Sequence, residues 1–499
     1  MALATSGEIF GRPRSVRGTN IPPNSIESRD SRERSPMRDQ QAHAAATPSF
    51  WHEDADLDWA PKGPLDGDLD VDVAIVGGGY TGLWTAYYLA KADPSLRIAI
   101  LEKYFVGFGA SGRNGGWCSA IFPTTLRKVA ADSSRSAAVR MQEAMFETVK
   151  EVGEVVVAEG IECDFQPGGY VSVARNEAQW VRSQREVDGW RAWGFGEEHF
   201  RMLTPDEAAE RVATSHTLGG TFTPHCAVVQ PAKLVRGLGD VVRALGVRIF
   251  EATEVREIHS GGLSTARGTV RADVVVRATE GYTAQLKGAR REVVPMYSLM
   301  VATAPLPEEI WQEIGLRERE TFSDKRHLRI YGQRTRDGRI AFGGRGAPYH
   351  FGSRVKPEFD DDRRVHEMLR NILVDLLPTI RGVEFTHAWG GNLGIPRDWY
   401  PSVGYDRSSG IGHAGGYVGD GVATANLAGR TLAAEILDLE NDVRSLPWVG
   451  RTTPRWEPEP LRWIGVNAGT AAFNIADRTE ARFGKPSRLA SGLWKVLGH

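Results

Sequence analysis

Three glycines near residue 80 have the spacing that lets a phosphate group approach the protein backbone. They stand in the segment AIVGGGYTGLW, between the apolar run VDVAIV (residues 71–76) and a stretch whose apolar residues recur at helical spacing. Gly77 permits a tight turn, Gly79 lets a pyrophosphate come close, and Gly82 lets the helix pack on the strand. Free N–H groups at the start of that helix would bind the phosphates. This strand–turn–helix pattern predicts a dinucleotide site, and its expected contacts are Gly77, Gly79, Tyr80, Thr81 and Gly82.

An acidic residue ends the next predicted strand, RIAILE. This residue, Glu102, follows Gly82 by about twenty positions, where a carboxylate can accept hydrogen bonds from both ribose hydroxyls of an adenosine. Its negative charge also disfavours a 2′-phosphate. Lys103 beside it is a further expected contact. The alternative interpretation is a solvated glutamate at a strand end, and up to this point NAD and FAD are not separated.

A second glycine-rich segment, VGFGASGRNGGWCSA (residues 106–120), follows directly. An NAD-binding fold does not need such a loop, whereas an extended FAD needs backbone to wrap its ribityl chain and flavin ring. With this segment the sequence resembles the D-amino acid oxidase superfamily of FAD enzymes and, within it, the γ-glutamylputrescine oxidase family. The resemblance implies that the loop lies along the pyrophosphate and flavin ring through Ala110, Ser111, Arg113, Asn114, Gly115 and Gly116. A flexible surface loop is the alternative.

The resemblance continues over roughly residues 50–440, through three later segments. VRIFEATEVREI resembles the third nucleotide strand, which implies that the backbone of Val255 pairs with adenine. ADVVVRATEGYT resembles the return strand, whose turn at Ala278, Thr279 and Glu280 would close over the adenosine. IGHAGGYVGDGVATANLAGRTLAAEIL resembles the last flavin segment. Its N-terminal amides would stabilise negative charge on the reduced flavin, through a helix start at Gly419, Asp420, Gly421 and Val422.

Long inserts separate these nucleotide-binding segments, so we predict a discontinuous α/β fold. The FAD-binding, Rossmann-like domain of the glutathione-reductase type would comprise residues 70–150, 226–290 and 400–440. An inserted mixed-sheet α+β substrate domain would comprise residues 151–225 and 291–399, and residues 441–499 would form a C-terminal tail packing on the body. Within the insert, the pair Asp337-Gly338 between apolar runs predicts a β-hairpin.

The family resemblance implies oxidation of a primary or secondary amine, such as an amino acid or a γ-glutamyl-polyamine-like compound. A hydride would pass to flavin N5, and water would hydrolyse the imine to a carbonyl product. The catalytic candidates lie where strand ends should face the flavin ring: Arg345, His387, Arg397 and Tyr400. Either arginine could clamp a substrate carboxylate bidentately or form a structural ion pair instead. His387 is more typical of a core histidine than of a proton carrier.

Two departures from related enzymes affect the cofactor and the electron acceptor. Monomeric sarcosine oxidases and amadoriases tether FAD to a cysteine near the segment that matches HAWGGNLG, but here no cysteine follows Cys226. We therefore expect FAD to be held without a covalent bond. Those oxidases also place a lysine beside the flavin to assist oxygen, whereas RIAFGGRG offers only Arg345. Molecular oxygen and another acceptor both stay open, as does a non-catalytic FAD-fold protein that acts in assembly or sensing.

Composition argues against several other classes of protein. The formal charge of −2 indicates no broad basic surface for nucleic acid, and no apolar run approaches the roughly 20 residues of a membrane span. Three separated cysteines, Cys118, Cys163 and Cys226, argue against a disulfide framework or a CxxC zinc site. We expect no metal, a small-molecule amine substrate and a cytoplasmic location.

The first 48 residues differ from the rest because they are rich in Arg, Ser and Pro and poor in large apolar residues. Such a composition cannot bury enough surface to fold, so we predict a disordered leader at residues 1–48. No apolar core of a secretory signal is present, and several acidic residues argue against a transit peptide. A translation start at Met37 is an alternative.

Overall fold

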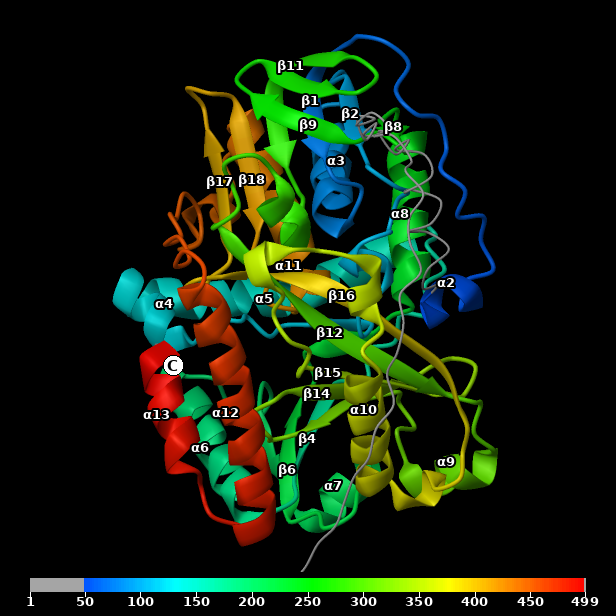
Figure 1. The fold of residues 1–499 in the computed structure, drawn as a ribbon, viewed down its shortest axis with the longest axis vertical. Coiled ribbons are helices and arrows are strands. Elements are labelled where there is room, and N and C mark those ends of the chain that lie inside the picture. Colours follow the sequence, from blue (N-terminus) through cyan, green and yellow to red (C-terminus); the bar gives the residue numbers. More distant parts are fainter. Residues whose placement is uncertain (1–48, 498–499) are drawn as a thin grey trace, which may run out of the picture.

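The computed structural model describes residues 49–497, which form two eight-stranded β-sheets and one small two-stranded sheet, with helices packed around them (Figure 1). The predicted leader, residues 1–48, lies outside the described residues. The first sheet has the strand order β17-β18-β11-β1-β2-β8, and β10 and β9 extend it from β11. Its strands are β1 (Leu69–Val76), β2 (Ile98–Leu101), β8 (Arg248–Phe250), β9 (Val255–His259), β10 (Gly262–Thr265), β11 (Thr269–Arg277), β17 (Ser402–Asp406) and β18 (Ile411–Gly415).

Strand β1 lies near the middle of this sheet, parallel to β2 on one side and to β11 on the other. Its end is buried on both faces, as the apolar run VAIV requires of a strand in a parallel sheet. Strands β8 and β18 continue the parallel pairing at β2 and β11. The carboxyl ends of these parallel strands therefore meet at one edge, where ligands bind in open α/β sheets.

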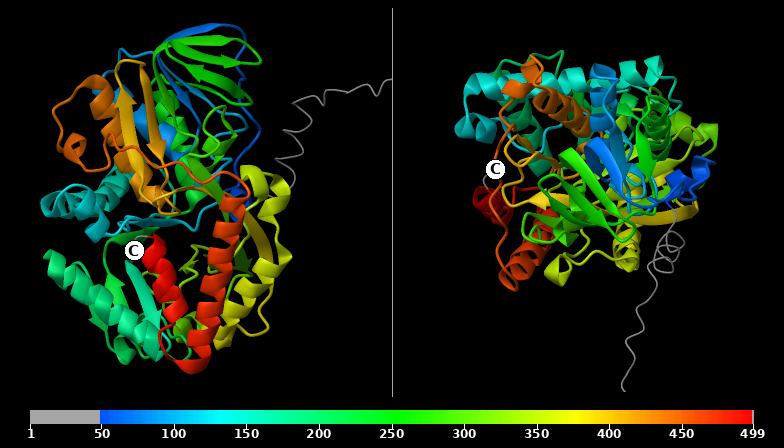
Figure 2. Two further views of the ribbon diagram at one scale, coloured as in Figure 1. Left: turned by 60° about the vertical axis from the view of Figure 1, so that its left-hand side comes forward. Right: turned by 90° about the horizontal axis from the view of Figure 1, so that it is seen from above.

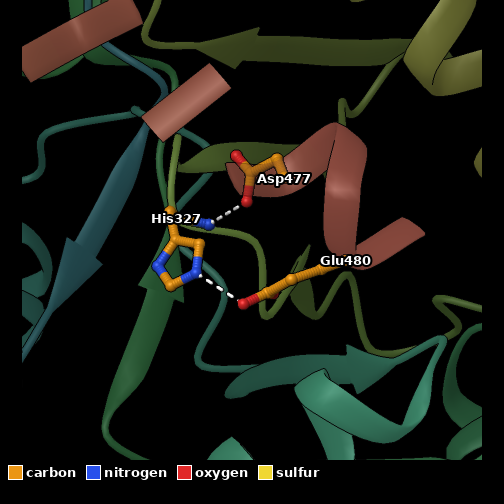
Figure 3. Close-up of side chains that lie close together, drawn as sticks. All are labelled: His327, Asp477 and Glu480. Atoms are coloured by element: carbon orange, nitrogen blue, oxygen red, sulfur yellow. Dashed lines mark hydrogen bonds and ion pairs between the residues drawn. The ribbon is translucent and has the colours of Figure 1, made fainter. Parts of the chain in front are cut away.

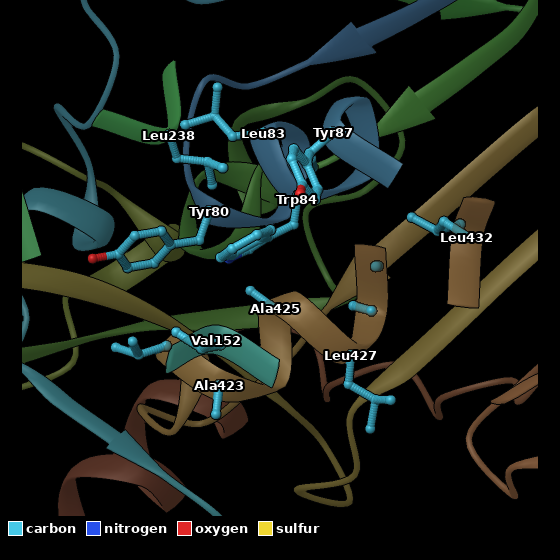
Figure 4. Close-up of a cluster of buried hydrophobic side chains, with 14 of the residues drawn as sticks. Tyr80, Leu83, Trp84, Tyr87, Val152, Leu238, Ala423, Ala425, Leu427 and Leu432 are labelled. Carbon is cyan, nitrogen blue, oxygen red and sulfur yellow. The ribbon is translucent and has the colours of Figure 1, made fainter. Parts of the chain in front are cut away.

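Helices α3 (Tyr80–Ala92) and α11 (Gly421–Leu437) pack against each other in the main hydrophobic core (Figure 4). Gly429 makes the close approach possible, because an added Cβ there would lie 2.7 Å from the backbone of Trp84. The long helix α5 (Arg135–Ala158) and α8 (Pro231–Ala244) contribute apolar side chains to the same core. This packing brings the N-termini of α3 and α11 to the same region of the molecule, since both border one cavity.

The second sheet is mixed, with the strand order β16-β12-β15-β14-β13-β4-β6-β5. Its strands are β4 (Tyr170–Ala174), β5 (Arg201–Leu203), β6 (Gly219–Thr223), β12 (Val293–Thr303), β13 (Thr321–Asp324), β14 (Ile330–Arg334), β15 (Ile340–Gly344) and β16 (Phe385–Pro396). Strands β14 and β15 form the antiparallel hairpin predicted at Asp337-Gly338, and Gly338 has φ +79° there. Helix α10 (Arg363–Leu376) buries its leucines against this sheet in a second core.

The remaining elements connect the sheets or cover them. They are α2 (Phe50–Asp54), α4 (Leu126–Asp132), α6 (Glu177–Trp193), α7 (Pro205–Arg211), α9 (Glu308–Ile314), α12 (Leu461–Phe483), α13 (Arg488–Leu497) and the small sheet of β3 (Trp117–Ser119) and β7 (Cys226–Val228). Helix α12 runs beside the half of the molecule that holds the second sheet (Figure 2). No helix within residues 49–497 is long and apolar enough to cross a membrane.

The predicted fold class is confirmed: a Rossmann-like α/β unit is joined to a mixed-sheet unit. The strands of the first sheet come from residues 69–101, 248–277 and 402–415, whereas those of the second come from 170–223 and 293–396. The chain therefore passes repeatedly between the two units, and residues far apart in sequence meet where the units join.

Candidate active site

Two adjoining cavities lie where the two units meet. The smaller cavity has a volume of about 420 Å³ and is bordered by the carboxyl ends of β1, β2 and β11. The larger cavity has a volume of about 970 Å³ and is bordered by β14, by Arg345 directly after β15 and by α6. The residues that line both cavities are Ala110, Asn114, Leu393, Gly419 and Val422. One extended ligand can therefore occupy the smaller cavity and reach into the larger one.

The three glycines of the turn after β1 have different physical roles. Gly77 has φ +111°, and an added Cβ would lie 2.5 Å from the carbonyl oxygen of Ala278. At Gly82 an added Cβ would lie 2.1 Å from the carbonyl oxygen of Gly77, so only glycine lets the helix sit against the turn. Gly79 has an ordinary extended backbone with φ −91°, and an added Cβ would crowd only the Ser111 hydroxyl. Gly79 thus leaves room for a ligand rather than for protein.

The N-terminus of α3 borders the smaller cavity, and Gly79 caps it without any side-chain hydrogen bond. The Tyr80 N–H donates to Ser111 Oγ at 2.9 Å, and Thr81 Oγ1 lies 2.9 Å from the Tyr417 hydroxyl oxygen. These contacts fix the start of the helix without covering it. The positive end of the helix dipole therefore faces the cavity, as phosphate binding requires.

Glu102 lies at the end of β2 and borders the same cavity. Its Oε2 accepts the Gly78 N–H at 2.7 Å, and its Oε1 accepts the Tyr104 N–H at 2.9 Å. Burial raises the pKa of Glu102, while these two bonds oppose the increase. The carboxylate thus holds the backbone of the glycine turn through Gly78, and each of its oxygens has a further lone pair that can accept a hydrogen bond from a ligand. Lys103 pairs with Glu254 at 2.6 Å, and Val255, Ala278 and Thr279 complete this wall.

Glu280, the third residue of the turn after β11, also lines the smaller cavity. Its carboxylate accepts the N–H groups of Gly394 and Tyr417 and so joins the turn after β11 to β16 and to the segment before α11. Burial raises its pKa to about 7. In the sequence, its position directly after Ala278 and Thr279 places it in the turn that should contact the adenosine.

The glycine-rich loop after β2 folds back between the two cavities. Asn114 holds it, because its Nδ2 donates to the Ala110 carbonyl at 3.1 Å and its Oδ1 accepts the Gly116 N–H at 2.8 Å. Arg113 is buried, donates to the Phe108 carbonyl at 3.0 Å and lies 3.6 Å from Asp360. Arg113 and Asn114 therefore hold the loop in shape and also line the larger cavity.

Helix α11 begins where the two cavities adjoin. Gly419 and Val422 line both, Gly421 lines the smaller cavity, and Asp420 lines the larger one. Asp420 caps the helix without a side-chain hydrogen bond to it, so the first amides are not covered by a cap. Burial raises the pKa of Asp420.

The predicted dinucleotide contacts line one or both cavities, with the exceptions of Gly82 and Gly116. Gly82 packs inside the turn, as its expected role requires. Gly116 has φ +69°, and an added Cβ would lie 2.0 Å from Gln333 Nε2 and 2.4 Å from the Val229 carbonyl oxygen. Gly116 therefore packs against protein and does not reach either cavity.

Two arginines meet in the larger cavity at the open end of the β14–β15 hairpin. Arg345 donates to the Val418 carbonyl oxygen and lies 5.4 Å from the centre of the Trp399 ring. Burial and the nearby charge of Arg329 lower the pKa of Arg345 to about 10. Its backbone N–H donates to the Arg329 carbonyl oxygen at 3.0 Å, which keeps the two residues adjacent.

Arg329 was not among the residues that the sequence predicted. Its exposed side chain lines the larger cavity, and its guanidinium makes no hydrogen bond or ion pair with residues 49–493, whose side chains the structure describes. It stands directly before the apolar start of β14 in HLRIYGQ. Only this position at a strand end could have indicated from the sequence that Arg329 lies at the cavity. Arg127 and Arg185 also line the larger cavity without a hydrogen bond or ion pair among the described side chains, but Arg329 is the uncommitted guanidinium that stands beside Arg345, which is bound to the backbone.

The other three catalytic candidates lie outside both cavities. His387 Nε2 lies 3.0 Å from Glu53 Oε2, and the ring packs on Phe50. Arg397 forms an ion pair with Glu457 at 2.9 Å. Tyr400 is fully buried, with the Arg451 guanidinium 4.1 Å from its ring centre.

Strand geometry explains why β16 presents Gly391 and Leu393 to the cavity instead of His387. Alternate residues share a face, so His387 faces the same side as Gly391 but about 13 Å further along the strand. There the helix α2 covers it, because Phe50 packs on the ring. Trp389, between the two, is buried and donates to the Arg113 carbonyl at 2.9 Å.

Aromatic side chains form another wall of the larger cavity. Trp117 contacts Tyr170, with 4.9 Å between ring centres, and meets Tyr331 edge-on at 6.0 Å. The Tyr331 hydroxyl lies 2.8 Å from Ser298 Oγ. Tyr331 packs against Gly115 of the glycine-rich loop, where an added Cβ would lie 2.6 Å from its ring.

This arrangement, a dinucleotide turn continued into a second cavity beside a helix N-terminus, defines a flavin-dependent oxidoreductase. The chain belongs to the FAD dependent oxidoreductase family DAO, whose family model matches residues 72–435.

The chain is 28% identical to gamma-glutamylputrescine oxidoreductase of Escherichia coli over 432 residues, which cover 84% of this chain and 96% of that protein. It is 30% identical to the probable oxidoreductase OrdL of Rhizobium meliloti, over 77% of this chain and 87% of that protein. Among solved structures, glycine oxidase from Geobacillus kaustophilus matches with a TM-score of 0.61 at 25% identity, over 77% of this chain and 100% of that one.

FAD is the cofactor, and the residues of the smaller cavity fit it. The N-terminus of α3 suits the diphosphate, Glu102 suits the ribose hydroxyls, and the start of α11 suits an electron-rich ring. The open space at Gly79 also fits FAD, because an added Cβ there would meet only the side chain of Ser111 within 4 Å.

We expect acid precipitation of the purified yellow protein to release all of its FAD into the supernatant. The three cysteines, Cys118, Cys163 and Cys226, are buried free thiols, and burial raises the pKa of each, which disfavours the reactive thiolate. Absorbance of pellet and supernatant checks this expectation. Flavin that stays with the pellet after denaturation would contradict it.

Proposed function

We propose that the chain oxidises a primary or secondary amine that also carries a carboxylate, giving an imine that water hydrolyses to a carbonyl product. The observation that carries this proposal is the uncommitted guanidinium of Arg329 in the larger cavity, beside Arg345. A planar guanidinium binds a carboxylate through two parallel hydrogen bonds, which fixes both distance and orientation. The carboxylate would thus be held close to the start of α11.

When bound, FAD supplies the hydride acceptor for the carbon next to the nitrogen. The protein's own contribution is to orient the substrate and to set its protonation state. Transfer of the amine from water into the cavity disfavours its charged form, so burial lowers the pKa of a bound substrate amine. An uncharged amine has the lone pair that the oxidation needs, and this route requires no dedicated general base.

Cavity size supports a substrate longer than a small amino acid. The larger cavity has a volume of about 970 Å³, and its aromatic wall of Trp117, Tyr170 and Tyr331 offers apolar surface to a carbon chain. The name of the Escherichia coli relative indicates that it acts on gamma-glutamylputrescine, whereas that of the solved relative indicates glycine. We propose an elongated, acidic amine of the first kind.

The electrons leave the reduced protein through molecular oxygen or another carrier, and we propose that the reaction takes place in the cytoplasm. A small-molecule amine is the only partner that the proposal needs. Arg345 stands where the sequence offers no lysine, so no lysine of the hairpin assists oxygen.

The test is anaerobic mixing of the FAD-loaded protein with a panel of amines, with and without a carboxylate. We expect carboxylate-bearing amines to bleach the flavin band near roughly 450 nm and matched neutral amines to do so only at much higher concentration. Admission of air afterwards shows whether oxygen restores the colour. If no amine reduces the flavin, the protein is not an amine oxidoreductase and a non-catalytic FAD-fold protein is the better interpretation.

A further inference from the structure

Helix α12, the last helix but one, is bound to the short loop that leads into Arg329. This loop, residues 325–329, connects β13 to β14. The Asp477 carboxylate of α12 accepts the N–H of His327 at 2.7 Å (Figure 3). It also accepts the N–H of Leu328 at 2.9 Å. Both carboxylate oxygens are thus used on the backbone immediately before Arg329.

Glu480, three residues further along α12, provides a second anchor to the same loop. Its Oε1 lies 3.0 Å from His327 Nε2, and its Oε2 accepts from Arg182 of α6 at 2.6 Å. The Ser487 N–H donates to it as well, at 2.9 Å. Burial disfavours the charge, but these partners outweigh it and lower the pKa of Glu480 to about 2. The anchor is therefore charged at any physiological pH.

Apolar contacts support the same junction. Leu328 packs with Phe473 and Ala476 of α12 and with Ala490 of α13. The His327 ring stacks on Phe473, with 5.8 Å between ring centres and 21° between the planes. The two C-terminal helices, α12 and α13, thus hold the loop at its backbone, at the His327 ring and at the Leu328 side chain.

The cluster of His327, Asp477 and Glu480 is not arranged to hold a metal ion, although its potential ligand atoms lie within 4.8 Å of one another. Arg182 already supplies the positive charge, since its Nη1 lies 3.1 Å from His327 Nε2 and its Nη2 donates to Glu480. The Asp477 oxygens are engaged by backbone N–H groups. The arrangement is that of an anchor between two chain segments.

The two carboxylates of this anchor lie beside the larger cavity but do not line it. His327 and Arg329 are among the lining residues, whereas Asp477 and Glu480 are not. Helix α12 also lies beyond residues 72–435, the part of the chain that matches the family model. Asp477 contacts the cavity lining through the loop, whereas Glu480 also binds Arg182 of α6, which lines the cavity itself.

We infer that Asp477 and Glu480 are positioning residues for the substrate carboxylate: they hold loop 325–329 so that the Arg329 guanidinium points into the larger cavity. The inference rests on the proposed function, because Arg329 must bind substrate for its position to matter. A guanidinium that is already held in place loses less conformational freedom when a carboxylate binds. A free loop would have to become ordered in each binding event.

The test uses the full-length FAD-loaded protein with Asp477→Ala, the milder Asp477→Asn and the control Arg478→Gln. Arg478 is the exposed neighbour of Asp477 on α12. We expect Asp477→Ala to weaken binding of a carboxylate-bearing amine about tenfold, in the range found for residues that act together. Asp477→Asn keeps one acceptor and should have a smaller effect, and Arg478→Gln should change nothing. The limiting rate of anaerobic flavin reduction should stay within about twofold, since only substrate binding is affected.

A double-mutant cycle shows whether the anchor acts through Arg329. In the Arg329→Gln background we expect Asp477→Ala to have no further effect on substrate binding. A tenfold loss that persists in that background would overturn the inference, because the anchor would then act by another route. Unchanged binding in both Asp477 variants would also overturn it.

Hydrogen exchange in the absence of substrate provides a measurement that does not depend on the reaction. The amides of His327 and Leu328 should exchange faster in Asp477→Ala than in the unchanged protein and the Arg478→Gln control. Unchanged exchange would show that Asp477 does not hold the loop. If exchange accelerates but Arg329→Gln leaves carboxylate binding intact, the proposed function fails and the recognition role fails with it.

Discussion

The Arg329→Gln variant is expected to bind a carboxylate-bearing amine about 100-fold more weakly than the unchanged protein, a loss of about 3 kcal/mol. The reason is the loss of a charged, two-pronged donor that no other described residue uses. Anaerobic flavin reduction at increasing amine concentration measures both the dissociation constant and the limiting rate. The loss should appear in the dissociation constant, because a clamp acts equally before and during hydride transfer.

Arg329→Lys separates charge from shape at the same position. Lysine keeps the positive charge but lacks the planar fork, so we expect an intermediate loss of about tenfold. Arg345→Lys should also weaken substrate binding, although lysine keeps the positive charge. The reason is that Arg345 donates to the Val418 carbonyl and so supports the segment before α11.

Two comparisons make the arginine result interpretable. A matched amine without the carboxylate should bind equally to Arg329→Gln and to the unchanged protein. Arg397→Gln should alter binding by less than about twofold, because Arg397 pairs with Glu457 and lies outside both cavities. Equal losses for charged and neutral amines would contradict a carboxylate clamp at Arg329.

Gly79→Val is expected to yield a folded protein that no longer retains FAD, with affinity lowered by at least about 1,000-fold. The valine side chain would occupy space at the N-terminus of α3, where the diphosphate must approach the amides. Fold disruption is not expected, because Gly79 has φ −91° and ψ −175°, which any residue adopts. Gly77 and Gly82 are unsuitable for this test, since side chains there would collide with backbone oxygens.

The measurement is flavin absorbance per protein after purification, followed by titration of FAD into the flavin-free protein. Gly465→Val in the exposed part of α12 is the control, because an added Cβ there meets no atom within 4 Å. Glu102→Ala provides a graded comparison and should lose about 1.5–3 kcal/mol of binding free energy. A Gly79→Val protein that is yellow after purification would show that the phosphates do not lie at this turn.

Local sequence was enough for the nucleotide-binding turn because all of its determinants are contiguous. The strand, the turn and the helix start follow one another directly, and Gly82 needs to be glycine because of the Gly77 carbonyl oxygen. The order of nucleotide segments and inserts likewise predicted a discontinuous Rossmann-like unit with a mixed-sheet insert. The turn and the discontinuous unit can be predicted because a given backbone shape requires the same residue types at the same spacing in every protein that forms it.

The candidate catalytic residues could not be chosen in the same way. Alternation along β16 predicts which face His387 occupies, but not that α2, more than 300 residues earlier, covers it. Arg397 pairs with Glu457, which lies 60 residues later in the sequence, so its guanidinium is already bound to a carboxylate of the protein. Neither partner can be read from the segment that carries the candidate.

Sequence by itself determined the cofactor, the fold class and the chemistry of the smaller cavity, since these depend on backbone shape within short segments. Only the tertiary structure decided which charged side chains line the larger cavity. Arg329 reaches the larger cavity because the β14–β15 hairpin places it next to Arg345 and because α12 anchors the preceding loop. Whether an arginine is free or paired depends on which distant carboxylates fold against it, and that is a property of the packed chain.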